Sequence, residues 1–328
     1  MAKIVMGIGM SHSPLLALSS DRWEERANDD RNNQRLNTIN GRFISYQELE
    51  RVTGAPYGAI ATPENFRQIE NKANALLDKL AADLELVKPD LVVIIGDDHR
   101  ELFSSANVPA IAIHAGPELV THQWPEMQET WRKTVAIGYG MDRPHVYPSD
   151  ASVGDQIIRG LIRREFDISA THKVDNPEVA GFGHAVGFVV ERIFKGRSIP
   201  VLPVILNTYY PPNNPTPQRC YNLGTALKEC IEELPSDMRV AVIGSGGLSH
   251  MVVEEELDQH IIAALRNKDA QALKSLPIAA LKSGSSEILC WVAAAGAFHH
   301  LPEKWLEYIP VRRTPAGTGI GLAFGAWY

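Results

Sequence analysis

Cysteine is scarce in this sequence. Three thiols occur in 328 residues, at Cys220, Cys230 and Cys290. They form no C-x-x-C pair, which leaves zinc-finger and thioredoxin-type sites without support. Their odd number also argues against a complete disulfide framework, and free thiols are typical of reducing compartments. The cysteine content therefore predicts a cytoplasmic protein.

Excess positive charge and long apolar runs are also missing. The chain has 32 Lys and Arg against 39 Asp and Glu, a formal net charge of −7. Because no basic block is present to meet phosphates, a nucleic-acid partner is not expected. No apolar run approaches the roughly 18 residues that a membrane span needs, so no membrane insertion is expected. The apolar start lacks the basic region and cleavage site of a signal peptide.

The sequence does contain an alternation of apolar strand patterns and helical patterns. Strands are expected at 3–10, 90–99, 108–116, 166–174, 199–206, 239–250 and 321–328. Helices are expected at 64–87, 126–137, 153–166, 184–194, 219–234, 253–276 and 285–298. Such alternation predicts an α/β fold, in which helices flank a mostly parallel or mixed central sheet. No break in composition divides the chain, so residues 1–328 are expected to form one domain.

Residues 18–62 interrupt this alternation. The segment is polar and contains the string DRWEERANDDRNNQRLN, with few aliphatic residues. We interpret it as an insertion outside the sheet that serves as a lid or as an oligomer contact. A symmetric homo-oligomer is the default expectation for a soluble protein.

Three histidines occupy the same position relative to predicted strands. His12 follows KIVMGIGMS, His99 follows DLVVIIGDD, and His250 follows RVAVIGSGGLS. Ligands of open α/β sheets bind outside the carboxyl ends of the strands. A single histidine after a strand is more often a cap or a surface residue. The repetition of the pattern favours a shared site where the three imidazoles converge.

A metal held by imidazoles also needs an anionic ligand. Two histidines and one carboxylate leave open positions that suit the oxygen chemistry of iron(II). The sequence offers Asp97, Asp98, Asp175 and Glu287 as carboxylates. Glu287 opens the strongly apolar helix EILCWVAAAGAF. It could complement the helix dipole, or it could turn inward as a ligand, and the residues alone favour neither.

Several strings resemble the class III, or LigB-type, extradiol dioxygenase family in both order and approximate spacing. They are SHSP at 11–14, DDH at 97–99, GFGHAVG at 181–187, GSGGLSH at 244–250 and SSEILCW at 285–291. The segment TYYPPNNPTPQRCYNLG at 208–224 is more similar to the protocatechuate and gallate branch than to the phenylpropionate branch. The resemblance covers most of residues 3–325, but residues 18–62 have no counterpart in it.

The resemblance implies a non-haem Fe(II) enzyme that opens a catechol ring with O₂. By motif, the iron ligands would be His12, His99 and Glu287. His250 would be the general base, and His184 the second active-site histidine, which contacts substrate or oxygen and donates a proton. The substrate implied is a small aromatic diol that bears a carboxylate, such as protocatechuate or gallate.

Other positions are candidates for supporting roles. Tyr209 is expected to line the substrate pocket, and Arg219 or Arg313 to meet the substrate carboxylate, with packing and solvation as the alternatives. Gly247, in the pair Gly246-Gly247, would permit a tight turn close to substrate and metal before His250. Asp97 or Asp98 could orient a histidine through its distal N–H, or could cap the next turn.

Two other functions fit part of the pattern. Histidines at strand ends with an acidic ligand also suit a zinc-dependent hydrolase, although no H-E-x-x-H helix is present. Memo-type proteins resemble the same dioxygenases and act in binding rather than catalysis. The presence of the full set argues against such a loss here: His12, His99, His184, His250 and Glu287.

Overall fold

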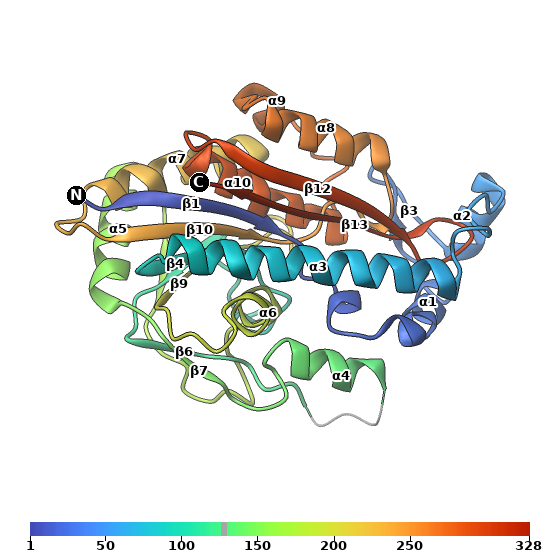
Figure 1. Ribbon diagram of the computed structural model, residues 1–328, viewed down its shortest axis with the longest axis horizontal. Helices are drawn as coiled ribbons and strands as arrows, with labels where there is room; N and C mark the ends of the chain where they lie inside the picture. The colour runs from blue at the N-terminus through green and yellow to red at the C-terminus, as the bar shows by residue number, and fades with distance from the viewer. Residues whose placement is uncertain (126–129) are drawn as a thin grey trace.

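The computed structural model describes residues 1–125 and 130–328 (Figure 1). Its centre is a nine-stranded sheet with the order β11-β13-β1-β10-β4-β9-β5-β8, in which β12 pairs with β13. The strands are β1 (Lys3–Met10), β4 (Leu91–Asp97), β5 (Ile111–His114), β8 (Ser169–Thr171), β9 (Val201–Leu206), β10 (Arg239–Ser245), β11 (His250–Val252), β12 (Glu303–Arg312) and β13 (Thr318–Trp327).

The middle of the sheet is parallel. Strand β10 runs parallel to β1 and to β4, and β4 runs parallel to β9. Strands β13 and β5 pair antiparallel on either side of this group, so the sheet is mixed, as predicted. Parallel strands covered on both faces are apolar throughout, which explains why every residue of β4 is buried. The four parallel strands end along one edge, and this edge carries the site.

Helices cover both faces of the sheet. One core joins the sheet to α3 (Pro63–Val87), α4 (Trp131–Gly138) and α6 (His184–Ile193). The other joins it to α5 (Ala151–Arg163), α7 (Pro217–Glu232), α8 (Glu255–Arg266), α9 (Ala270–Lys274) and α10 (Ile288–Phe298). Figure 1 shows α3 extending along the length of the sheet. Among the described residues, no helix combines the length and apolarity required to cross a membrane.

Sequence patterns predicted most of the helices and sheet strands, but some strands were not predicted. Helix α3 begins as expected, because the Thr62 side chain accepts from Asn65 N and Pro63 occupies the first turn. The helix predicted at 126–137 begins at Trp131 in the structure, and residues 126–129 lie outside the described residues. Strand β12 was missed, because charged residues and Pro310 interrupt its apolar pattern. The short pair β6 (Glu118–Val120) and β7 (Val146–Pro148) was also missed.

The polar insertion folds into η2 (Ser20–Arg22), α1 (Trp23–Arg31), β2 (Leu36–Asn37), β3 (Phe43–Ile44) and α2 (Tyr46–Thr53). Figure 1 places α1 and α2 together at one end of the molecule. Its attachment is buried: the buried Trp23 donates from Nε1 to the Leu15 carbonyl, outside the insertion, at 3.2 Å. Asp30 is fully buried and accepts from Arg313 Nε at 2.7 Å and from Thr318 Oγ1 at 2.8 Å. The insertion is therefore fixed to the strand β13 region.

Candidate metal centre and active site

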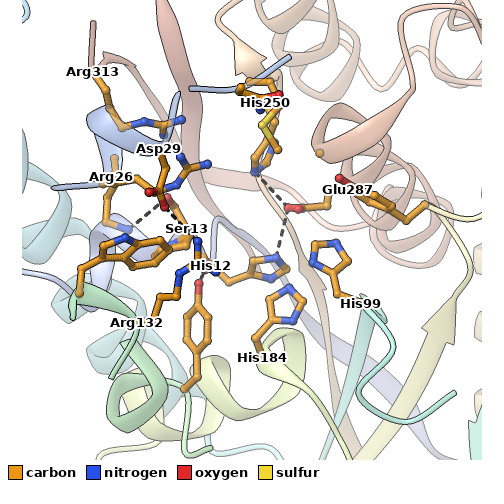
Figure 2. A pocket seen from close by; sticks show the side chains of 18 of the residues that line it. His12, Ser13, Arg26, Asp29, His99, Arg132, His184, His250, Glu287 and Arg313 are labelled. Carbon is orange, nitrogen blue, oxygen red and sulfur yellow. Dashed lines mark hydrogen bonds and ion pairs between the residues drawn. The ribbon is translucent and has the colours of Figure 1, made fainter. Parts of the chain in front are cut away.

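Strand ends and helix starts bring the predicted side chains together. His12 follows β1, His99 follows β4, and His250 opens β11 after the turn that leaves β10. His184 is the first residue of α6, and Glu287 ends the short helix η3 (Ser283–Glu287) before α10. Figure 2 shows the four rings directed toward a common region beside Glu287. Convergence of residues from five separate segments is what a bound ion or substrate requires.

The hydrogen bonds of His12 determine which nitrogen faces the site. Its Nδ1 lies 2.9 Å from Ser245 Oγ. The Ser245 hydroxyl donates its only proton to the Ala185 carbonyl at 2.7 Å, so it must accept from His12. Neutral His12 therefore carries its proton on Nδ1 and presents the Nε2 lone pair to the site. Tyr139 fixes the same loop by donating to the His12 carbonyl at 2.7 Å.

The other two buried rings are oriented in the same way. His184 Nδ1 donates to Glu101 Oε1 at 2.6 Å, and His250 Nδ1 donates to the Leu248 carbonyl at 2.8 Å. Both rings therefore turn Nε2 toward the centre. Glu101 reaches His184 because Gly183 has no side chain, since a Cβ there would lie 2.2 Å from Glu101 Oε2. His99 differs in that 35% of its side chain is exposed to the cavity.

Glu287 turns inward, which decides between the two readings of its position. One of its oxygens, Oε2, lies 3.2 Å from His12 Nε2 and 3.4 Å from His250 Nε2. The same oxygen accepts the backbone N–H of Gly247 at 2.8 Å. Burial alone would raise the pKa of Glu287, but the charges of His250 and His12 outweigh it and hold this pKa below its ordinary value. Glu287 is therefore an anionic donor at the centre.

The nitrogen and oxygen atoms that face the centre fit a divalent cation as its ligands. Among the described residues, His12 Nε2 and both carboxylate oxygens of Asp97 are buried and have no hydrogen-bond partner. Ligand atoms of His12, Asp97 and His184 lie within 4.8 Å of one another, as do those of Asp97, His99 and Glu287. Buried donors left without protons or partners are what a cation would satisfy. The predicted ligands His12, His99 and Glu287 thus lie in one cluster, linked through Asp97.

Two imidazoles in this cluster have pKa values displaced in opposite directions. Burial lowers the pKa of His250, which the nearby Glu287 only partly offsets. Burial also acts to lower the pKa of His184, but the charge and hydrogen bond of Glu101 reverse this and raise it. The pKa of Glu101 falls to about 2, because the attraction of His184 outweighs burial. A neutral ring and a readily protonated ring therefore face one cavity, the arrangement of a base and an acid.

The cluster forms one end of a cavity of about 490 Å³. The other end is charged and is lined by Arg26, Asp29, Arg132 and Arg313. Figure 2 shows these side chains across the cavity from the histidines, with Ser13 between the two groups. Helix α1 of the insertion supplies Arg26 and Asp29, so this segment forms part of the cavity wall.

Three predicted substrate contacts have different positions in the structure. Tyr209 lines the cavity, its ring centroid 4.7 Å from that of His99 and its hydroxyl 2.9 Å from Ser283 Oγ. Arg219, at the start of α7, lies with its guanidinium over the Phe166 ring and is not among the residues that line the cavity. Gly247 donates its N–H to Glu287 and is likewise not among the residues that line the cavity. A Cβ at Gly247 would lie 2.3 Å from His250 Cε1, so close approach explains this glycine.

Some of the supporting residues had no signal in the sequence. Ser245 and Glu101 orient His12 and His184 from distant segments, and only the adjacent Gly183 hints at the second contact. Asp98, one of the carboxylates proposed to orient a histidine, instead accepts from the backbone N–H groups of Arg100 and Leu102 and caps the next turn. Burial and then the nearby Glu101 carboxylate raise the pKa of Asp98 to about 6, although these backbone contacts act to lower it.

Comparisons with known proteins point to one family. Residues 54–322 match the family model described as the catalytic LigB subunit of aromatic ring-opening dioxygenase. These residues include His99, His184, His250 and Glu287, whereas His12 precedes them.

Curated relatives carry names of ring-cleaving enzymes. A gallate dioxygenase from Pseudomonas putida is 30% identical over 182 residues, which cover 52% of this chain and 51% of that protein. A 2,3-dihydroxyphenylpropionate/2,3-dihydroxicinnamic acid 1,2-dioxygenase from Xanthobacter autotrophicus is 26% identical, covering 55% and 49%. One of the same name from Cupriavidus necator is 24% identical, covering 79% and 74%. The chain thus spans about half the length of the first two relatives.

Proposed function

This chain belongs to the LigB family of aromatic ring-opening dioxygenases, and on that premise we propose that it is a non-haem Fe(II)-dependent extradiol dioxygenase. Its substrate would be a small catechol, opened beside the diol with O₂. The observation that carries the proposal is the convergence of His12, His99 and Glu287, linked through Asp97, beside two imidazoles with opposite pKa shifts. Both kinds of group are needed to hold a metal and to move protons.

The protein's own residues account for the proton movements. A bound Fe(II) would supply the redox-active centre at which a chelated diol and O₂ react. His250 is neutral near pH 7 and turns its Nε2 lone pair inward, so it can accept a proton from a catechol hydroxyl. His184 retains its proton through Glu101 and can donate it from Nε2 to an oxygen atom that originates from O₂.

The charged end of the cavity supports a substrate that bears a carboxylate. Arg26 and Arg313 share the carboxylate of Asp30, and Arg132 pairs with Asp29 at 3.0 Å. The three guanidinium groups exceed the two carboxylates by one charge, which an anionic substituent would balance. The diol and the carboxylate would then occupy opposite ends of the cavity. In this proposal the substrate carboxylate meets Arg26 and the predicted Arg313, and not Arg219.

Location and assembly follow as further proposals. All three cysteines are buried and unbridged, which suits the reducing cytoplasm. A symmetric homo-oligomer remains the expectation for the assembly.

The test is anaerobic loading with Fe(II) followed by oxygen uptake against a panel of catechols. We expect uptake and a ring-opened product with the wild type, and loss of both with His12→Ala and Glu287→Ala. His260→Ala is the matched control, because His260 is exposed on α8 and is not among the residues that line the cavity. Absence of uptake with any catechol, despite one tightly bound metal, would instead favour a zinc hydrolase or a binding protein.

A further inference from the structure

Asp97 has a role that the family's predicted ligand set leaves open. It is the last residue of β4, and its side chain is completely buried. Within residues 1–125 and 130–328, neither of its carboxylate oxygens accepts a hydrogen bond. A buried carboxylate that accepts no hydrogen bond is satisfied by a cation placed beside it.

The adjacent carboxylate shows how such a group is ordinarily satisfied. Asp98 accepts backbone N–H groups from Arg100 at 3.0 Å, from Leu102 at 2.7 Å and from Phe103 at 3.3 Å. Asp97 has the same side chain one position earlier and accepts none. The difference is one of direction: Asp98 turns to its own loop, whereas Asp97 turns into the histidine cluster.

The contacts of Asp97 are those of a donor that shares a centre with its neighbours. Its Oδ2 lies 2.9 Å from His99 Nε2, yet this contact lacks hydrogen-bond alignment. Its Oδ1 lies 3.9 Å from Nε2 of His12 and 3.9 Å from Nε2 of His184. Donor atoms that approach closely without pointing at each other are arranged around a common third point. Both sets of ligand atoms within 4.8 Å include Asp97, and no other residue belongs to both.

We propose that Asp97 is a direct protein ligand of the metal in the substrate-free enzyme, alongside His12, His99 and Glu287. The centre then has two imidazoles and two carboxylates, and the two negative charges balance a divalent cation. The inference rests on the metal site of the proposed function, but not on ring cleavage. Asp97 would hold the metal before a catechol is present.

Co(II) alone is the probe, since it binds without catechol or O₂ and reports its ligands through its visible absorption. The variant is Asp97→Asn, which keeps the shape and removes the charge, and the matched control is Asp98→Asn. We expect the Co(II) Kd to rise about 10- to 100-fold in Asp97→Asn, with an altered Co(II) spectrum. Both should be unchanged in Asp98→Asn.

Thermal unfolding of the metal-free protein separates a ligand from a structural residue. If Asp97 serves the metal, Asp97→Asn removes one of two buried carboxylates whose oxygen atoms lie within 4.8 Å of each other, and the melting temperature of the metal-free protein holds or rises because their repulsion is lost. If Asp97 serves only the fold, that temperature falls while the Co(II) Kd stays the same, which overturns the proposal. An unchanged Kd and spectrum in Asp97→Asn overturn it as well. Asp97→Ser should show the same loss of Co(II) affinity, so that the result does not depend on one substitution.

The outcome is distinguishable from that of the proposed function. Weakened Co(II) binding in Asp97→Asn, together with no catechol cleavage by the wild type, would support the ligand and reject the dioxygenase. Catechol cleavage by the wild type, with normal Co(II) binding in Asp97→Asn, would support the dioxygenase and reject Asp97 as a metal ligand.

Discussion

The two ends of the cavity hold their charges in opposite ways. At the histidine end, His12 Nε2 and the Asp97 carboxylate are buried without hydrogen-bond partners among the described residues. At the arginine end, Arg26 and Arg313 pair with Asp30, and Arg132 pairs with Asp29. The first group is incomplete without a cation, whereas the second is largely neutralised by its own carboxylates.

The difference indicates how each end was built. Donors at the histidine end come from the ends of sheet strands and the starts of helices, which are rigid supports for a site that must keep its geometry. Donors at the arginine end come mainly from the insertion and α4. We infer that the histidine end performs the chemistry and that the arginine end selects the substrate. Each prediction below sharpens or breaks this division.

The largest effect is expected from His250→Gln, which removes the inward-facing base. We expect kcat to fall about 10²- to 10⁴-fold, because the catechol proton loses its acceptor, while Fe(II) binding is retained. Stopped-flow turnover and metal content measure the two quantities. A variant that keeps wild-type kcat would show that His250 is not the base.

The next effect concerns stability at the arginine end. Asp30→Asn leaves Arg313 buried beside a neutral partner, and breaking a buried ion pair of this kind costs about 3 kcal/mol. Denaturant unfolding measures the change. Asp29→Asn is the control, because Asp29 pairs with Arg132 at a solvent-exposed position, and we expect little change there. Equal losses in the two variants would contradict the buried anchor.

A smaller effect should separate the two arginine assignments. Arg26→Met keeps the apolar stem and removes the charge, so KM for a carboxylated catechol should rise about tenfold. KM for unsubstituted catechol should stay the same, because the diol binds at the other end. Arg219→Met is the control, since Arg219 lies over Phe166. An equal rise in KM for both substrates would contradict a carboxylate subsite.

The smallest effect is a shift in pH dependence. Glu101 raises the pKa of His184, so in Glu101→Gln burial acts unopposed and this pKa falls. His184 then loses its proton at lower pH, and the alkaline limb of the kcat profile should move down by about one pH unit. Imidazole NMR titration gives an independent reading of the same pKa. Glu191→Gln, on the same helix, should leave both unchanged, and an unmoved limb in Glu101→Gln would exclude His184 as the acid.

Local sequence patterns predicted the sheet and the histidine end more fully than the arginine end. Apolar runs that end at His12, His99 and His250 predict a shared site directly, because parallel strands end along one edge of the sheet. Tertiary contacts such as Ser245 with His12, or Asp30 with Arg313, join residues more than 200 positions apart and leave no local pattern. The position of Arg219 over Phe166 had no local signal either, since a helix start does not reveal which way a side chain turns.

The hydrogen bonds that Asp30 accepts from Arg313 and Thr318 also have a consequence for synthesis of the protein. Strand β1, which leads to His12, pairs with β13, and the wall formed by α1 is fixed by residues more than 280 positions later. A nascent chain that has not yet released β13 from the ribosome therefore lacks the contacts that hold this wall. The charged wall of the cavity can be fixed only after translation has passed this strand, although every residue proposed to hold the metal has been synthesised before it.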